Sequence, residues 1–144
     1  CGYCRKASKV VEEFLKEDQN IRFIVKEFPI LGEASLTSSK FAIAVKNVGG
    51  PEKYRLVHNI LLTLSAEPSD AYLRRIANEL QLNPEKLFEA MESESVLQEI
   101  SLTAKLAEKL QISGTPTFIL DEQFLRGFVP LDVLLQMAQT LRNK

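Results

Sequence analysis

Apolar side chains recur every three or four residues along most of this chain, which is the spacing of amphipathic helices. A first helix is predicted directly behind the N-terminus and ends near Asp18, where the apolar stripe stops. Residues 33–111 keep the same spacing between turn and capping signals, so an entirely helical block is predicted there. The signals within this block are Gly49-Gly50, Pro51, Ser69 and Asn83-Pro84. Pro130 opens a last amphipathic helix.

Two parts of the chain have the character of β-strands instead. Ile21–Phe28 is rich in β-branched and aromatic residues and ends before a proline, so it is predicted to be a strand. Thr117–Leu120 and Gln123–Gly127 are short runs on either side of Asp121-Glu122, which predicts a β-hairpin. The order of elements is helix, strand, several helices, hairpin and helix, and it indicates an α/β protein.

Size and charge exclude several classes of protein. The 144 residues leave room for one domain with a modest insertion. The formal net charge of −1 gives no broad positive field, so no nucleic-acid partner is expected. No apolar run approaches the roughly 20 residues of a membrane-spanning helix. Because the chain starts on Cys1 rather than on methionine, the lack of a leader says nothing about the compartment.

The chain has two cysteines, and both lie at the start of the first predicted helix, in the segment Cys1-Gly2-Tyr3-Cys4. Two intervening residues bring both sulfurs within disulfide reach on one helical turn. The unsatisfied N–H groups and the dipole of a helix N-terminus stabilise a thiolate. Cys1 is therefore the candidate catalytic nucleophile for thiol–disulfide exchange, and Cys4, one turn inside, is the candidate resolving thiol.

Three other interpretations of the cysteines stay open beside exchange. A zinc site would need two further ligands, and the chain has no third cysteine and a single histidine. A purely structural disulfide would close so short a loop that it stabilises little. Cys1 as an N-terminal nucleophile of a hydrolase would need layered sheets, and three predicted strands do not supply them. We therefore expect redox exchange, with no metal and no organic cofactor.

A Gly-Thr-Pro turn leads into the predicted hairpin. A cis X–Pro bond occurs at only about 5–6% of such positions, typically where a tight turn requires it. We predict a cis bond between Thr115 and Pro116, because it would expose the Thr115 backbone to an extended substrate beside Cys1. Thr115 and Pro116 are thus candidate substrate-binding residues, and Tyr3 is assigned with them.

Three other chemistry-bearing residues are harder to interpret. His58 shares a helical face with Tyr54 and is interpreted as a core or boundary residue rather than a catalyst. Lys26 and Glu27 lie near the end of the predicted strand. A buried charge there would relay protons to Cys4. A solvated strand end is an equally good interpretation.

The segments discussed so far together resemble the DsbA family of thioredoxin-fold oxidoreductases, over nearly the whole chain. The matching segments are Cys1-Gly2-Tyr3-Cys4, Lys26-Glu27-Phe28-Pro29-Ile30-Leu31 and Gly114-Thr115-Pro116-Thr117-Phe118. The resemblance implies an α/β, thioredoxin-like fold with an all-helical insertion. Residues 1–32 and 112–144 would form the thioredoxin-like domain, and residues 33–111 the insertion. It also implies Cys1 as nucleophile, Cys4 as resolving cysteine and Pro116 as the cis-proline.

For function, the resemblance implies an enzyme that exchanges disulfides with cysteine-containing exported proteins, and we expect it to act as an oxidase. It further implies a periplasmic or otherwise exported location and a membrane-bound, DsbB-like partner that re-oxidises the dithiol. A disulfide isomerase or reductase of the same fold is the alternative. A non-enzymatic binding domain with inert cysteines is a further one.

The chain departs from the family in two places. The best-known members carry Pro-His between the cysteines, where this chain has Gly2-Tyr3, so strong oxidising power does not follow from the resemblance. The family's strand before the dithiol helix is missing, and an empty sheet position would leave N–H and C=O groups unpaired. We therefore expect the 144 residues to be a fragment.

Overall fold

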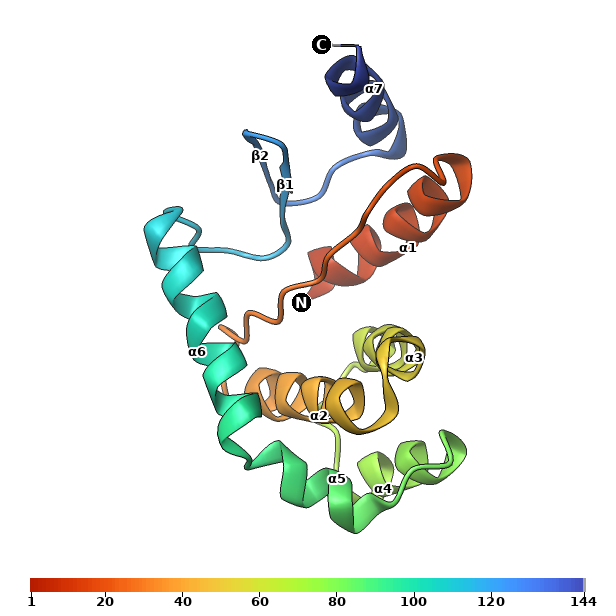
Figure 1. Ribbon diagram of the computed structural model, residues 1–144, viewed down its shortest axis with the longest axis vertical. Coiled ribbons are helices and arrows are strands. Elements are labelled where there is room, and N and C mark those ends of the chain that lie inside the picture. Colours follow the sequence, from red (N-terminus) through yellow and green to blue (C-terminus); the bar gives the residue numbers. More distant parts are fainter. Residues whose placement is uncertain (144) are drawn as a thin grey trace. The chain divides into compact units, whose positions relative to one another are not determined.

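The computed structural model describes residues 1–143 and divides into two compact units (Figure 1). One unit combines Cys1–Val25 with the segment from Ile112 onward, and the other is Lys26–Gln111. The chain leaves the first unit after Val25 and returns to it at Ile112, so the second unit is inserted into the first. Residues 26–32, which the sequence analysis grouped with the first domain, lie in the inserted unit.

The inserted unit consists of helices, as its periodicity predicts. These are α2 (Glu33–Gly49), α3 (Pro51–Thr63), α4 (Asp70–Glu79), α5 (Pro84–Met91) and α6 (Glu94–Lys109). Helix α2 packs against α3, α5 and α6 and is the centre of the unit. Five consecutive residues of α2, from Phe41 to Val45, are at most 1% exposed, so this helix is enclosed on all sides at that point.

The helix boundaries of this unit follow local signals in the sequence. The Ser69 hydroxyl accepts the N–H of Tyr72, and the Asn83 side chain accepts the N–H of Lys86. Pro51 and Pro84 occupy first-turn positions, where a missing N–H costs nothing. Gly50 ends α2 with a φ of 86°, a conformation that favours glycine. These predicted caps are confirmed.

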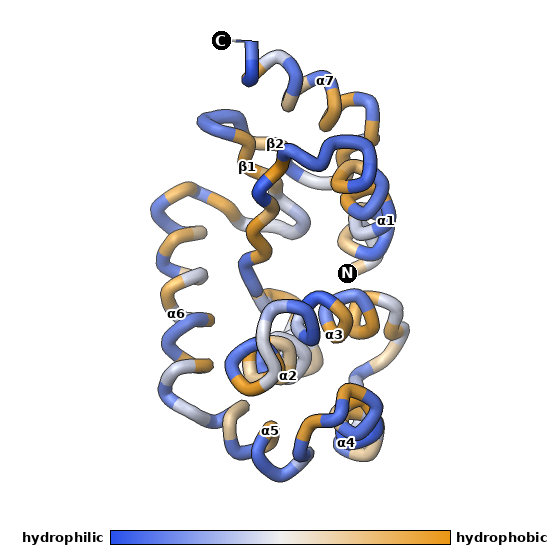
Figure 2. Tube along the Cα trace, turned by 45° about the vertical axis from the view of Figure 1, so that its right-hand side comes forward, coloured by the Kyte–Doolittle hydropathy of each residue, from blue (hydrophilic) through white to orange (hydrophobic). Residues whose placement is uncertain are grey.

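The first unit combines two helices with a hairpin. Helix α1 (Gly2–Glu17) packs against α7 (Leu131–Arg142), and strands β1 (Thr117–Leu120) and β2 (Gln123–Arg126) pair antiparallel. The predicted hairpin is confirmed, with Asp121-Glu122 as its turn. Figure 2 shows apolar and hydrophilic positions alternating along α7. The core of the unit is formed by Phe14, Val129, Leu134 and Ala138, and Phe118, Leu120 and Leu125 of the hairpin pack against it.

The strand predicted over Ile21–Phe28 is wrong. This segment has no regular secondary structure, and Phe23 and Ile24 are 42% and 58% exposed. A strand needs a hydrogen-bonded neighbour, and the sheet in the described part of the chain consists of β1 and β2 alone. High β-propensity without a partner therefore leaves the segment irregular.

Among residues 1–143, no helix is both long enough and apolar enough to cross a membrane.

Candidate active site

The candidate site is built on the first turn of α1. Cys1 is the N-cap residue of this helix, and its sulfur accepts the backbone N–H of Cys4 at 3.1 Å. Cys1 and Cys4 form a disulfide, with their Cα atoms 5.2 Å apart. Cys1 is exposed whereas Cys4 is half-buried. An incoming thiolate therefore has freer access to the sulfur of Cys1 than to that of Cys4.

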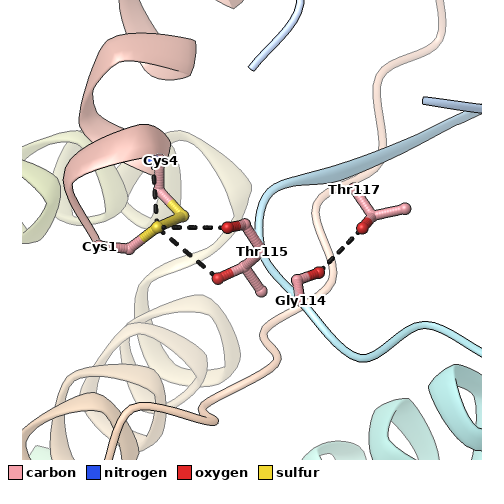
Figure 3. The surroundings of a disulfide bond; sticks show 5 residues. All are labelled: Cys1, Cys4, Gly114, Thr115 and Thr117. Carbon is pink, nitrogen blue, oxygen red and sulfur yellow. Dashed lines mark hydrogen bonds between the residues drawn. A yellow bond between two sulfur atoms is a disulfide. The ribbon is translucent and has the colours of Figure 1, made fainter. Parts of the chain in front are cut away.

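Thr115 faces the same sulfur from the hairpin side of the unit, as Figure 3 shows. Its carbonyl oxygen lies 3.5 Å from Sγ of Cys1, and its hydroxyl donates to that sulfur at 3.7 Å. A disulfide sulfur carries no proton, so the carbonyl contact becomes a hydrogen bond only in the reduced, protonated form. The peptide bond between Thr115 and Pro116 is cis, as the sequence analysis predicted.

Hydrogen bonds hold the Gly-Thr-Pro turn in place. The N–H of Gly127, just after β2, donates to the carbonyl of Pro116 at 2.8 Å. The hydroxyl of Thr117 donates to the carbonyl of Gly114 at 2.8 Å (Figure 3). Because β2 is paired with β1 and the hairpin packs on the core of the unit, the position of Thr115 is tied to that core.

The groups around Cys1 act on its charge in opposite directions. The Cys4 N–H and the positive end of the α1 dipole favour a thiolate, and the Thr115 hydroxyl adds a weak donor. The Thr115 carbonyl, with its partial negative charge, opposes the thiolate. The Cys4 N–H is the nearest of these groups, so we expect the thiolate to be stabilised on balance.

Tyr3 lies on the exposed side of the same helical turn. Its side chain is 64% exposed, and the ammonium group of Lys6 lies 5.9 Å from the centre of its ring. Such a ring offers an apolar surface to a bound segment, but its role in binding stays a prediction.

Glu27 and Lys26 differ in how far their side chains are buried. Lys26 is exposed, in keeping with a solvated position. The Glu27 side chain is only 14% exposed, and one of its oxygens accepts the Tyr54 hydroxyl at 2.8 Å. The same oxygen lies 3.1 Å from Nδ1 of His58, and the other accepts the Ser39 hydroxyl at 3.1 Å. We call these residues the Glu27 cluster, and all four belong to the inserted unit.

Burial and hydrogen bonding shift the pKa of Glu27 in opposite directions. Burial alone would raise the pKa of Glu27, but the hydrogen bond and charge of His58 outweigh it, with help from Tyr54 and Ser39. The pKa of Glu27 is therefore lower than usual. Burial, together with the neighbouring carboxylate, raises the pKa of Tyr54 far above its usual value. Tyr54 thus stays a protonated donor.

The sequence analysis did not identify Ser39 or the Tyr54 hydroxyl as partners of Glu27. The available signal was the spacing of Tyr54 and His58, which stand four residues apart and so share a helical face. His58 is a half-buried boundary residue, as interpreted, and it contacts a carboxylate. Within residues 1–143, no group of three or more His, Cys, Asp or Glu side chains is arranged to hold a metal ion.

Solved structures of similar fold include a thioredoxin-like oxidoreductase and a thiol-disulfide exchange protein. A crystal structure of a thioredoxin-like oxidoreductase from Silicibacter pomeroyi DSS-3 matches with a TM-score of 0.90 and 33% identity, covering 100% of this chain and 82% of that one. The thiol-disulfide exchange protein α-DsbA2 from Wolbachia pipientis matches with a TM-score of 0.89 and 26% identity, covering 98% and 76%. The predicted fold is confirmed.

The family model of the DSBA-like thioredoxin domain matches residues 1–139, so the chain belongs to that family. Among curated proteins, the Na⁺/H⁺ antiporter NhaA 1 from Salinispora arenicola is 26% identical over 134 residues. That match covers 93% of this chain but only 20% of the antiporter, so the chain spans about a fifth of its length. A match of this extent gives no ground for assigning ion transport to this chain.

Replacing Thr115 by valine removes the hydroxyl that donates to Cys1 and keeps the carbonyl. We expect the pKa of the Cys1 thiol to rise, by no more than about one unit or ~1.4 kcal/mol, because the contact is long. The ultraviolet absorbance of the thiolate, followed against pH in the reduced protein, measures it. Thr140→Val is the matched control, since its hydroxyl donates to the Gln136 carbonyl within α7 and takes no part in the Gly-Thr-Pro turn. A lowered or unchanged thiol pKa in Thr115→Val would count against the proposed contact.

The Glu27 cluster predicts a pH dependence of stability. The pKa of Glu27 in the folded protein lies below its ordinary value of 4.5. The contribution of Glu27 to folding stability is therefore complete above about pH 4.5 and is lost as the pH falls through the folded pKa. Glu27→Gln should therefore lower the free energy of unfolding by roughly 1–3 kcal/mol at neutral pH. Urea unfolding of both proteins should show this gap closing on acidification. A gap that stays constant or widens in acid would contradict the prediction.

Proposed function

We propose that this chain is the catalytic domain of a disulfide-exchanging enzyme that acts mainly as an oxidase on exported proteins. The observation that carries the proposal is the Cys1–Cys4 disulfide at the cap of α1, with Thr115 beside the exposed sulfur. Cys1 and Cys4 are the catalytic pair in this proposal.

The reaction begins at the accessible sulfur. A substrate thiolate attacks Sγ of Cys1, a bond forms between these two sulfurs, and the Cys1–Cys4 bond breaks. Cys4 leaves as a thiolate and takes up a proton. A second substrate thiolate then attacks the substrate sulfur of the mixed disulfide, and Cys1 leaves as a thiolate. The substrate loses two electrons, which the cysteine pair gains.

The stabilisation of Cys1 as a leaving group favours this direction. The Cys4 N–H and the α1 dipole act on the thiolate that the second step releases, and a stabilised reduced form makes a dithiol a better oxidant. With Gly2-Tyr3 between the cysteines, no imidazole within that turn adds to this effect. For this reason an isomerase or reductase is the second candidate function.

Substrate binding is proposed to use the turn beside Cys1. An open hollow of about 190 Å³ is lined by Ser113, Gly114, Thr115, Pro116, Thr117, Arg126 and Gly127. An extended segment placed there could pair with the Thr115 backbone, and the exposed ring of Tyr3, on the first turn of α1, would offer it an apolar face. Backbone pairing depends on the conformation of the bound segment rather than on its side chains. Many cysteine-containing proteins would therefore bind at this turn.

A disulfide donor needs an oxidising compartment and an oxidant that restores it. The proposal therefore includes an exported location, such as the periplasm, and a membrane-bound, DsbB-like partner that accepts the two electrons.

Two serine variants test the proposed roles. Cys4→Ser keeps the nucleophile and removes the resolving thiol, so the reduced variant should accumulate a mixed disulfide when given an excess of an oxidised peptide. Cys1→Ser should form this adduct at least about tenfold more slowly, because Cys4 is less accessible and lies inside the helix. Mass spectrometry of the alkylated proteins detects the adduct. If both variants formed the adduct equally fast, or if neither formed it, the roles of Cys1 as nucleophile and Cys4 as resolving thiol would be contradicted.

A further inference from the structure

Basic side chains occupy the start of α1 where acidic ones would stabilise it. Helix N-termini favour negative charge because their unsatisfied N–H groups carry partial positive charge. Here the first turn contains no acidic residue, and Arg5, Lys6 and Lys9 precede the first acid, Glu12. Arg5, Lys6 and Lys9 are all exposed.

The basic residues of α1 also oppose one another. Lys9 stands four residues after Arg5 and three after Lys6, and like charges at these spacings destabilise a helix. Two local rules are therefore broken within the turns that follow the disulfide. Such departures are expected at functional sites, where a stability cost is kept for another reason.

The first of these residues, Arg5, lies one helical turn from Cys1. Arg5 follows Cys1 by four residues, so both lie on the same side of α1, and the backbone N–H of Arg5 donates to the backbone carbonyl of Cys1 at 3.1 Å. The buried residues Ala7 and Phe14 mark the side of α1 that packs on the core. The basic side chains thus stand on the solvent side of the helix that begins at the disulfide.

A second element contributes an independent positive charge. Arg126 is the last residue of β2, pairs in register with Thr117, and lines the hollow next to Thr115 and Pro116. The side chain is exposed.

We propose that Arg5, Lys6 and Arg126 select substrates whose reactive cysteines lie in acidic segments. This inference rests on the proposed function, because it concerns which polypeptides reach the Cys1–Cys4 disulfide. Carboxylates flanking the substrate cysteine are attracted from both α1 and β2 while the Thr115 backbone holds the segment. Attraction of this kind acts mainly on the rate of encounter and weakens as salt increases.

Three dithiol peptides that differ only in their flanking residues test the selection. With flanks of glutamate, glutamine or lysine, each peptide reduces the oxidised protein, losing two electrons and two protons as its own disulfide forms. Flanking charges also change the reactivity of the peptide thiols. Each rate constant is therefore divided by the rate of the same peptide with neutral 2-hydroxyethyl disulfide. The ratio of the normalised rate constant of the glutamate peptide to that of the lysine peptide then measures selection by the protein.

At low ionic strength we expect this ratio to be roughly tenfold, and to approach one at high salt. Arg126→Gln and Arg5→Gln should each lower it several-fold. Lys16→Gln is the matched control, because it removes the same charge about 22 Å along α1 from Cys1 and should change the ratio far less. Using a ratio cancels any change that a variant makes in the reactivity of the disulfide itself.

A ratio near one in the unmodified protein, or a ratio that the arginine variants do not change, would overturn the selection. Oxidation of all three peptides at equal normalised rates would do so while leaving the proposed function intact. Failure to oxidise any of them would instead remove the proposed function, and the selection with it.

Discussion

The sulfur of Cys1 caps helix α1, and the chemistry of the site depends on this interaction. The N–H of Cys4 donates to that sulfur at 3.1 Å. A negative charge formed on the sulfur therefore interacts first with the N-terminus of the helix rather than with a side chain. The same geometry keeps Cys4 half-buried one turn inside, within reach of Cys1. In the proposed function, a helix end thus supplies both the stabilised thiolate and the difference in access between the two cysteines.

The rest of the first unit holds the second part of the site opposite this sulfur. Helix α1 packs on α7, the hairpin packs on the same core, and the Gly127–Pro116 hydrogen bond ties the Thr115 turn to β2. Thr115 therefore reaches Cys1 from an element more than a hundred positions later in the chain. The donor and the carbonyl of Thr115 act on the thiolate in opposite senses, so small changes at this residue should tune the dithiol.

Much of this arrangement could be predicted because its signals are local. The two cysteines at a helix start, the caps at Ser69 and Asn83, and the hairpin around Asp121-Glu122 each depend on a few neighbouring residues. The strand at Ile21–Phe28 could not be judged in this way, because strand formation depends on a partner elsewhere. The Glu27 cluster joins Glu27 to residues 12 to 31 positions away, and no local pattern reveals that Ser39, Tyr54 and His58 contact one carboxylate.

The redox equilibrium of the Cys1–Cys4 pair with glutathione shows whether this pair exchanges disulfides and how strongly it oxidises. A stabilised Cys1 thiolate predicts a disulfide that forms and breaks reversibly, with a reduction potential well above the ~ −270 mV of thioredoxin and toward the ~ −120 mV of a strong oxidant. Quantifying reduced and oxidised protein over a series of glutathione ratios gives this potential. A potential at or below ~ −270 mV would contradict the oxidase assignment, and the absence of a reversible disulfide would contradict exchange altogether.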